Sequence, residues 1–298
     1  MNDGSLSALR RAGSISGEAR DLGAEMVDGG VSYLEVVEEV ESLIVRRGAE
    51  PAFPVNISVN EIAAHYTPST GDETRFERGD VVKIDVGAHV DGHIGDTAVT
   101  VEVGTRNNQR LIEASRRALA IALEMVGPGL TVSTIGGAIE RSIRSDGFKP
   151  VVNLTGHGME RYCLHAGLTV PNVDDGNLSR FKKDMVVAIE PFATDGGGQV
   201  KNGKPGNIFR ILRERPMKDK AALEFFNVIR DRFNRLPFCE RWCTAIDPNA
   251  PNYLRTLVRH GLVSSYPILN EHKGGTVSQA EHTVLINDSK IEILTGTH

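Results

Sequence analysis

Two aspartates lie in apolar, β-branched segments, where a buried charge is costly. Asp85 lies within Val81–Val86, and Asp96 lies in the next apolar run, 96 − 85 = 11 positions further on. Glycines and polar residues connect the two runs, which we interpret as the strands of a hairpin. Two carboxylates brought together in this way repel each other and lose their hydration. A divalent cation between them would offset both costs; two surface aspartates at strand ends are the alternative interpretation.

Three further residues enlarge this set of metal-ligand types. Glu190 and Glu281 each adjoin an apolar, strand-like run, and His157 lies between two glycines. Two aspartates, two glutamates and one histidine supply many oxygen ligands and one nitrogen. Such a mixture suits a pair of borderline-hard divalent ions better than a structural zinc, which prefers cysteine and histidine.

The composition restricts the class of protein. The chain has 298 residues, 40% of them hydrophobic, which permits one large domain or two medium ones. A formal net charge of −5 argues against a general nucleic-acid binder. The three cysteines form no even pattern, which favours a reducing compartment. We find neither a secretory signal nor an apolar run of about 18 residues. We therefore expect a cytoplasmic protein that does not span a membrane.

Two pairs of helices with a common pattern are predicted. The first pair covers 5–27 and a segment that begins at Ser32, with Glu35 at the capping-box position, and ends before Gly48. The second pair covers 107–126 and 131–144. A shift of 147 − 48 = 99 positions superposes glycines, acids and apolar positions of the two pairs. A chance match between similar helix pairs is the alternative, but the pattern favours a duplicated chain with a site between its halves.

Residues 201–262 differ in composition from the rest of the chain. They are predicted to contain helices at 221–235 and 252–260, inserted between two strands of the main sheet. The segment has 13 Lys and Arg against 6 Asp and Glu, so it carries +7 while the remainder carries −12. An ordinary solvated face is one interpretation of this charge. The sharper hypothesis is a docking surface for an RNA-rich partner such as the ribosome.

The order of the five metal-ligand candidates resembles the dimetal site of the methionine aminopeptidases. The 11-residue interval between Asp85 and Asp96 is the one that this family shows. Other segments also match: Phe53–Ser58, Ala63–Pro68, Gly156–Gly158, His165–Gly167 and Ile189–Thr194. The interval of 281 − 190 = 91 residues before the last glutamate resembles the type II branch, and the lack of a long charged N-terminal extension resembles its archaeal form.

This resemblance covers essentially the whole chain and implies a fold. The fold is α+β, the pita-bread fold, with a curved, mainly antiparallel sheet, outer helix pairs and pseudo-twofold symmetry. It implies a single catalytic domain over residues 1–298, with the helical insertion at approximately 201–262. The implied reaction is removal of the N-terminal methionine from nascent chains and peptides whose second residue is small.

The resemblance also implies a cofactor of two divalent ions, for which Co²⁺, Mn²⁺, Fe²⁺ and Zn²⁺ are all suited. In the family pattern Asp85 chelates one ion, His157 and Glu190 hold the other, and Asp96 and Glu281 bridge both. A water between the ions would have a lowered pKa and would attack the scissile carbonyl.

Two further histidines match residues that contact substrate in the family. His65 and His165 are therefore assigned to substrate binding and catalysis, with His165 stabilising the developing oxyanion or orienting the scissile amide. Glu190 is implied as a proton shuttle in addition to its role as a ligand. His89 and His93 match no ligand position, and strand alternation turns His282 away from the side of Glu281.

The methionine side chain requires a narrow apolar pocket. Phe53, Leu164 and Phe192 are candidates for its walls, and Gly156 is expected to leave space; ordinary core residues are the alternative interpretation. Two other functions remain open at this point. One is a proline-specific peptidase on the same scaffold. The other is a non-catalytic homologue that binds RNA or protein, although such homologues lose metal ligands and all five are present here. We expect the chain to be a monomer.

Overall fold

The computed structural model describes residues 2–288 and 290–296, and its helices follow the predicted pattern. Every predicted helix is present with ends within two residues of those expected, and α6 was not predicted. Ser32 caps the second helix by accepting a hydrogen bond from the Leu34 N–H. The predicted capping box differs from this N-cap, because in the box the hydroxyl would accept from the N–H of Glu35. The helices are α1 (Asp3–Met26), α2 (Tyr33–Arg46), α3 (Gln109–Met125), α4 (Val132–Ser145), α5 (Lys220–Phe233), α6 (Glu240–Ile246) and α7 (Ala250–Arg259).

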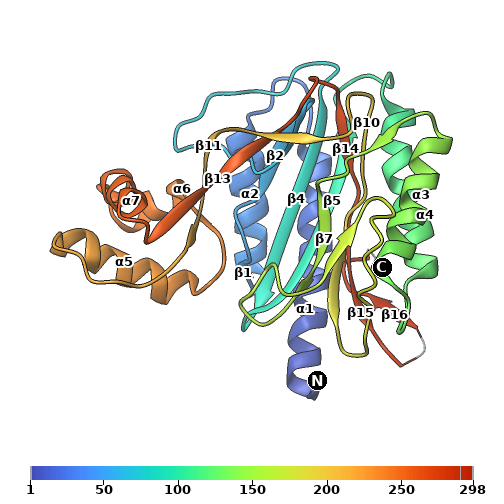
Figure 1. Ribbon diagram of the computed structural model, residues 1–298. Helices are drawn as coiled ribbons and strands as arrows, with labels where there is room; N and C mark the ends of the chain where they lie inside the picture. Colours follow the sequence, from blue (N-terminus) through green and yellow to red (C-terminus); the bar gives the residue numbers. More distant parts are fainter. Residues whose placement is uncertain (1, 289, 297–298) are drawn as a thin grey trace.

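The strands pair antiparallel throughout the ladders that the structure describes. The strands of the main body lie between α1 and α2 on one side and α3 and α4 on the other, and β11 and β13 extend beyond α2 (Figure 1). The strands are β1 (Glu50–Pro51), β2 (Asn56–Val59), β3 (Ile62–Ala64), β4 (Val81–Val90), β5 (His93–Glu102), β6 (Lys149–Pro150), β7 (Thr155–Met159), β8 (Thr169–Pro171), β9 (Val186–Ile189), β10 (Phe192–Thr194), β11 (Val200–Ile211), β12 (Phe238–Cys239), β13 (Val263–Glu271), β14 (Val277–Gln279), β15 (His282–Ile286) and β16 (Ile291–Ile293).

The two halves repeat the same local structure at the predicted shift. Helix α4 begins 132 − 33 = 99 residues after α2, and β6 begins 149 − 50 = 99 residues after β1. Gly30 and Gly129, also 99 apart, have φ values of 87° and 86°. Each carbonyl accepts a hydrogen bond of 2.6 Å from an arginine, Arg75 in the first half and Arg180 in the second. The repetition of these contacts confirms the predicted pseudo-twofold relation.

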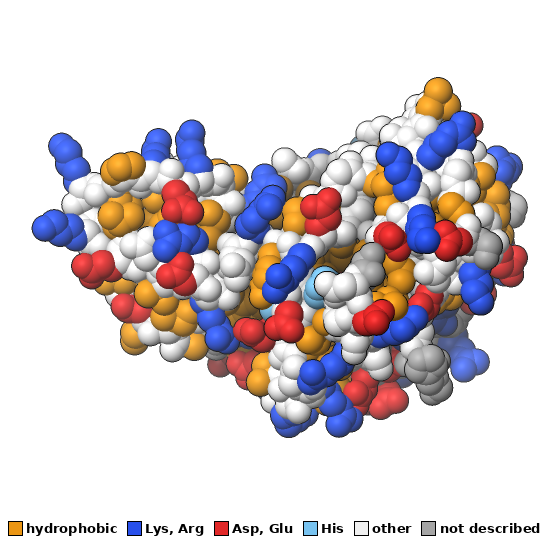
Figure 2. Space-filling view, turned by 90° about the horizontal axis from the view of Figure 1, so that it is seen from below, with side chains coloured by type: hydrophobic (Ala, Val, Ile, Leu, Met, Phe, Trp, Pro, Cys, Tyr) orange, Lys and Arg blue, Asp and Glu red, His pale blue; other side chains and the backbone are white. Residues whose placement is uncertain are grey.

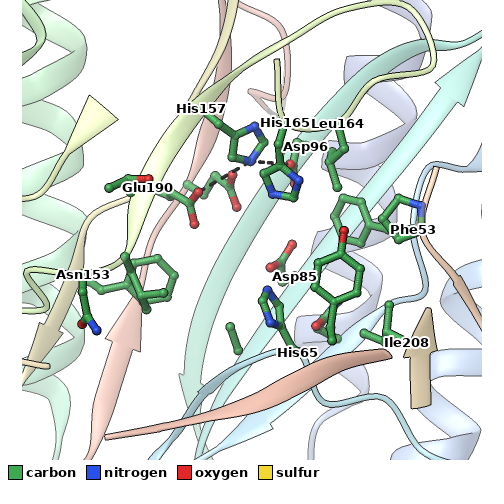
Figure 3. Close-up of a pocket in the computed structure, with 18 residues that line it drawn as sticks. Phe53, His65, Asp85, Asp96, Asn153, His157, Leu164, His165, Glu190 and Ile208 are labelled. Carbon is green, nitrogen blue, oxygen red and sulfur yellow. Dashed lines mark ion pairs between the residues drawn. The ribbon is translucent and has the colours of Figure 1, made fainter. Parts of the chain in front are cut away.

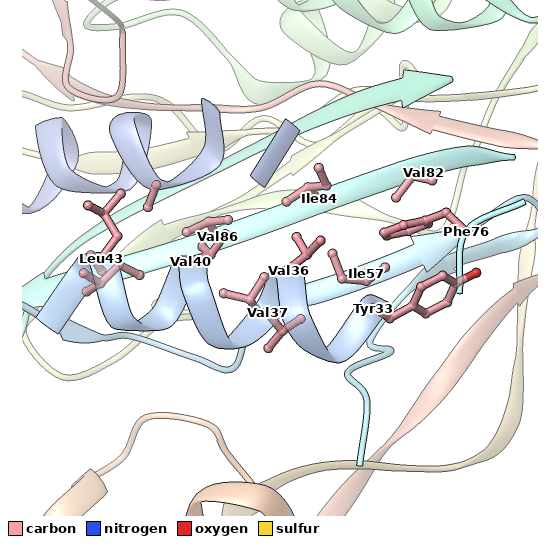
Figure 4. Close-up of a cluster of buried hydrophobic side chains, with 14 of the residues drawn as sticks. Tyr33, Val36, Val37, Val40, Leu43, Ile57, Phe76, Val82, Ile84 and Val86 are labelled. Carbon is pink, nitrogen blue, oxygen red and sulfur yellow. The ribbon is translucent and has the colours of Figure 1, made fainter. Parts of the chain in front are cut away.

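Side chains along β4 point alternately to two faces of the sheet, one packed in the core and one facing the candidate site. Val82, Ile84 and Val86 lie on the face of β4 that packs against α1 and α2, and they share one buried cluster with Val36 and Val40 of α2 (Figure 4). Because successive side chains of a strand point to opposite faces, Asp85 is turned away from these helices. The apolar face therefore fixes the strand against its helices, and the other face is available for a site.

The predicted insertion begins within β11 and ends just before β13, and its helices form a lobe beside the main body (Figure 1). Its interior is an apolar cluster that includes Phe226 and Phe238. A buried contact fastens the lobe to α2. Glu41 accepts two hydrogen bonds from Arg241, at 2.7 and 2.9 Å, and one of 2.8 Å from the indole N–H of Trp242. Among residues 2–288 and 290–296, no helix has the length and apolar character needed to cross a membrane.

Candidate metal centre

A cavity of about 230 Å³ lies where strands of the two halves meet (Figure 3). It takes side chains from both halves and from the inserted segment. The lining residues are Phe53, Asn56, Ala64, His65, Asp85, Asp96, Asn153, Leu154, Thr155, His157, Leu164, His165, Glu190, Phe192, Ile208, Pro237, Tyr266 and Glu281. All five side chains predicted as metal ligands are therefore in one cavity.

The hairpin of β4 and β5 brings the two aspartates together. Asp96 on β5 pairs with Gly87 on β4. Gly87 is two residues after Asp85, and residues two apart on a strand share a face, so both carboxylates project from the same face of the sheet. A backbone bridge from Ala98 to Glu281 adds the C-terminal segment beside β5. The local sequence thus decides the side on which the aspartates project, and long-range pairing supplies the glutamate.

The second half contributes the imidazole and the other glutamate. His157 on β7 pairs with Ala188 on β9, and Glu190 directly follows that strand. His157 Nε2 lies 3.6 Å from Asp96 Oδ2 and 3.6 Å from Glu190 Oε1. Ligand atoms of Asp96, His157 and Glu281 all lie within 4.8 Å of one another. Such spacing lets a single ion reach groups from both halves of the chain.

Burial dominates the electrostatics of this cluster. It raises the pKa of Asp85 to about 7. It also raises the pKa values of Asp96, Glu190 and Glu281 well above their ordinary range, and the neighbouring carboxylates raise them further. Burial, together with the nearby His165, lowers the pKa of His157 to about 3. The histidine is therefore neutral at physiological pH, as a metal ligand must be, whereas the raised pKa values of the acids mean that protons compete with a cation for them.

The residues present fit a divalent metal centre. Asp85 Oδ1 and Asp96 Oδ1 are buried without a hydrogen-bond partner. Buried carboxylate oxygens are normally paired, because desolvation of an unpaired acceptor is costly. Several such oxygens and one neutral imidazole around a single cavity match the ligand preference of Mn²⁺, Fe²⁺, Co²⁺ or Zn²⁺.

The two other predicted histidines also line this cavity. His65 directly follows β3 with a φ of 67°, a conformation that non-glycine residues rarely adopt and that is enriched at functional sites. Its Nδ1 lies 3.3 Å from the Pro267 carbonyl, so Nδ1 carries the proton and Nε2 is left as an acceptor. The ring of His165 lies 4.3 Å from that of His157, centroid to centroid. Burial, His65 and Arg210 lower its pKa to about 4.

The predicted methionine pocket is represented in the cavity by Phe53, Leu164 and Phe192, but not by Gly156. The structure gives Gly156 another reason to be small: a Cβ there would lie 2.3 Å from the Ala188 carbonyl oxygen of the adjacent strand. The absence of a side chain at Gly156 therefore permits the close packing of these two strands.

Sequence reasoning missed several residues of the cavity wall. Asn56 lies directly opposite Asp85 in the β2–β4 ladder, so the hairpin pattern extended by one strand would have found it. Ile208, Pro237 and Tyr266 come from the insertion and β13, and no local signal indicates that these segments fold back over the site. His89, His93 and His282 do not line this cavity, and His282 Nδ1 instead contacts Thr295 Oγ1 at 2.9 Å.

Comparison with known proteins gives one consistent family. Residues 7–287 match the model of metallopeptidase family M24. A methionine aminopeptidase of Archaeoglobus fulgidus is 45% identical over 296 residues, which cover 99% of this chain and 100% of the relative. That of Methanocaldococcus jannaschii is 44% identical over 284 residues, covering 95% and 96% respectively.

Solved structures agree at the level of the fold. A methionine aminopeptidase from Thermotoga maritima superposes with a TM-score of 0.73 at 23% identity, covering 100% of this chain and 98% of that one. A thermophilic Arx1 reaches a TM-score of 0.89 at 16% identity, covering 100% and 92%. The fold is thus the predicted pita-bread fold, and the identity to the archaeal enzymes extends over nearly the whole chain. The chain belongs to metallopeptidase family M24 and, within it, to the methionine aminopeptidases.

Proposed function

We propose that this protein hydrolyses the first peptide bond of nascent proteins and peptides that begin with methionine and have a small second residue. The observation that supports this most strongly is the convergence of four carboxylates and one neutral imidazole on one narrow cavity. Family membership supports the reaction, and the cavity supports its specificity. A space of about 230 Å³ with Phe53, Leu164 and Phe192 in its wall suits one unbranched apolar side chain.

We further propose how the five residues divide the metal ligation. Asp85 would hold one divalent ion, His157 and Glu190 the other, and Asp96 and Glu281 would contribute to both. The central place of Asp96 and Glu281 in the cluster supports this division, since each has ligand atoms within 4.8 Å of those of His157. Bound ions would supply Lewis-acid catalysis, polarising the scissile carbonyl and lowering the pKa of the attacking water.

Three residues of the chain are proposed to orient the substrate and move protons. His165 is neutral at physiological pH because of its lowered pKa, so its N–H can donate to the scissile carbonyl oxygen without placing a competing cation beside the ions. His65 Nε2 is a free acceptor, suited to a substrate amide N–H. Glu190 has a raised pKa, which favours its use as a proton shuttle.

Release of methionine from Met-Ala-Ser tests the proposed reaction. The purified protein is treated with chelator, dialysed and reconstituted with Mn²⁺, Fe²⁺, Co²⁺ or Zn²⁺ in turn. We expect methionine release only after reconstitution, and little release when a bulky residue replaces alanine. Xaa-Pro peptides serve as the comparison. Preferential cleavage of Xaa-Pro would identify a proline-specific peptidase and overturn the proposal.

The insertion is proposed to dock the enzyme on the ribosome near emerging chains. Its net charge of +7 supports this, but the structure changes which cations are suitable candidates. Arg230 forms ion pairs with Glu214 and Asp231, so its charge is largely offset. Arg213, Arg215 and Lys218 are exposed and lie within 4.0 Å of no carboxylate among the described residues. Figure 2 shows Lys and Arg side chains projecting from the lobe at the left end of the molecule.

Co-sedimentation with ribosomes at increasing salt tests this docking. Charge reversal at Arg213, Arg215 and Lys218 should weaken co-sedimentation, whereas the same reversal at Lys183, an exposed lysine outside the insertion, should have little effect. Equal sedimentation of all variants would remove the docking proposal without affecting the enzymatic one.

We also propose that the protein is a monomer, which analytical ultracentrifugation would test. We further propose a cytoplasmic location, which the three unpaired cysteines support.

A further inference from the structure

Gln279 places a neutral amide among the acidic groups of the cavity. Its side chain is 1% exposed on β14, two residues before Glu281. Nε2 lies 3.3 Å from Glu190 Oε2 and 3.4 Å from Glu281 Oε2. A side-chain amide has two N–H groups, so it can donate one hydrogen bond to each carboxylate. The amide nitrogen must face these oxygens, because the amide oxygen would be repelled by them.

This amide is the one side chain in residues 2–288 and 290–296 that donates a hydrogen bond to the carboxylates of the cluster. Asp96 Oδ1, by contrast, has no partner. The four acids repel one another, so a carboxylate without a donor would rotate away from the centre or retain a proton. A lysine or arginine in place of Gln279 would also orient the acids, but its positive charge would compete with a bound cation.

The position of Gln279 is itself fixed from the other half of the molecule. Its backbone N–H donates to Thr100 Oγ1 at 2.8 Å, and the same hydroxyl donates to the Gln279 carbonyl at 2.6 Å. Thr100 is 1% exposed and lies on β5, four residues after Asp96. Strand β5 thus carries the proposed ligand Asp96 and also Thr100, which holds Gln279 beside the proposed ligands Glu190 and Glu281.

We propose that Gln279 is a positioning residue that holds the carboxylates of Glu190 and Glu281 in the orientation required by divalent metal ions. The inference rests on the proposed metal centre and adds to it a residue that contacts neither metal nor substrate. Hydrogen bonds to metal-ligating groups typically contribute about 10- to 100-fold in metal affinity. The amide orients the acids without neutralising them, which explains why a neutral donor occupies this position.

Calorimetric titration of chelator-treated protein with Mn²⁺ tests the proposal without reference to activity. Gln279→Met removes both N–H donors and preserves the side-chain length. We expect its Mn²⁺ affinity to fall about 10- to 100-fold, with an unchanged far-UV circular dichroism spectrum. The matched control is Gln109→Met, which removes an exposed amide 3.3 Å from Glu102 on the surface. This control should bind Mn²⁺ as the parent protein does.

Variants of Thr100 provide an independent measurement. Thr100→Ser keeps the hydroxyl and should retain the parent affinity, whereas Thr100→Val removes it and should weaken Mn²⁺ binding. If Gln279→Met does not fold, Gln279→Asn serves instead, because its amide is one methylene too short to reach both acids. In steady-state assays the kcat for Met-Ala-Ser should fall in Gln279→Met with little change in KM, since the amide does not contact the peptide.

Two outcomes separate this inference from the proposed function. If Glu281→Gln loses Mn²⁺ binding while Gln279→Met and Gln279→Asn keep the parent affinity, the positioning role is overturned and the metal centre stands. If Glu281→Gln itself binds Mn²⁺ as tightly as the parent, the proposed metal centre is wrong, and the role of Gln279 is overturned with it.

Discussion

Thr283 and Asp96 form a reciprocal pair of hydrogen bonds across the junction of the two halves. The Asp96 N–H donates to Thr283 Oγ1 at 2.8 Å, and the same hydroxyl donates to the Asp96 carbonyl at 2.7 Å. Thr97 adds one further hydrogen bond across this junction, because its hydroxyl donates to the Glu281 carbonyl at 2.7 Å. Buried threonine hydroxyls therefore fix the backbone of the two residues that are proposed to contribute to both ions. We call these threonine hydrogen bonds between the two halves the seam. The relative positions of Asp96 and Glu281 depend on it.

Thr283→Val should weaken the seam without changing the shape of the side chain. Each buried backbone group that loses its partner costs about 1–3 kcal/mol. We therefore expect a lower Tm and weaker Mn²⁺ binding, measured by calorimetry on the same sample. Thr70→Val, at an exposed turn, is the control and should change neither quantity. A parent-like Mn²⁺ affinity in a destabilised Thr283→Val variant would show that the seam supports the fold alone.

Asp96→Asn should separate stability from function. In metal-free protein the substitution removes a repelled, desolvated carboxylate, so the Tm near pH 7.5 should stay the same or rise. The increase in Tm on addition of Mn²⁺ and the release of methionine should both disappear. Asp288→Asn, on an exposed surface residue, should behave as the parent protein does. Full activity of Asp96→Asn would contradict its proposed role in the centre.

His165→Ala should impair turnover more than metal binding. The side chain lines the cavity beside His157, and it is proposed to contact substrate and not the ions. Removal of one such hydrogen-bond donor costs about 10²- to 10³-fold in kcat in comparable sites. We expect the metal content, measured by atomic emission, to remain at the parent level. Loss of metal in parallel with activity would instead assign His165 to the coordination of the ions.

The affinity for Mn²⁺ should rise with pH. Folded-state pKa values of the four acids are raised, with that of Asp85 at about 7, so protons compete with the metal as the pH falls through this range. His157 does not compete above pH 5, because its pKa is lowered to about 3. Titration calorimetry in buffers of different ionisation enthalpy should detect proton release on binding at pH 6.5. Binding that is independent of pH from 6 to 8, with no released protons, would contradict the arrangement.

Glu271 is expected to stabilise the fold in a pH-dependent way. This buried carboxylate accepts backbone hydrogen bonds from Gly197 at 2.6 Å, Lys273 at 2.8 Å and Gly275 at 3.0 Å. Its pKa is lowered from 4.5 to about 2, since these N–H groups favour the charged form over the opposing effect of burial. The resulting stability is complete above the unfolded pKa and is lost as the pH falls toward 2.

Glu271→Gln should therefore lower the free energy of unfolding at pH 7 by about 1–3 kcal/mol, measured by urea denaturation. The difference from the parent should shrink at pH 3, where the parent begins to lose this contribution. Glu292→Gln, which removes a surface ion pair with Arg10, should cost less at either pH. A difference that is constant between pH 3 and pH 7 would mean that the charge of Glu271 does not stabilise the fold.

The sequence by itself determined the local structure and the chemical inventory. Helical periodicity located the helices of the body to within two residues, and the apolar, β-branched runs around Asp85 and Asp96 predicted the hairpin that carries both carboxylates. The 99-residue shift predicted the duplication, because caps and glycine conformations depend on neighbouring residues. The resemblance to the methionine aminopeptidases then assigned the four acids and His157 to one metal site.

Only the tertiary structure decided how distant segments meet. Asp85 and Glu281 are 281 − 85 = 196 residues apart, and β5 must pass beside the C-terminal segment before they share a cavity. The same pairing brings Thr283 onto Asp96 and Gln279 onto Glu190, contacts for which the chain has no local signal. The contribution of Tyr266 to the wall and the offset charge of Arg230 also depend on how the insertion packs. Periodicity reports the geometry of one element, whereas a site depends on the register between elements, which side-chain packing and long-range hydrogen bonds determine.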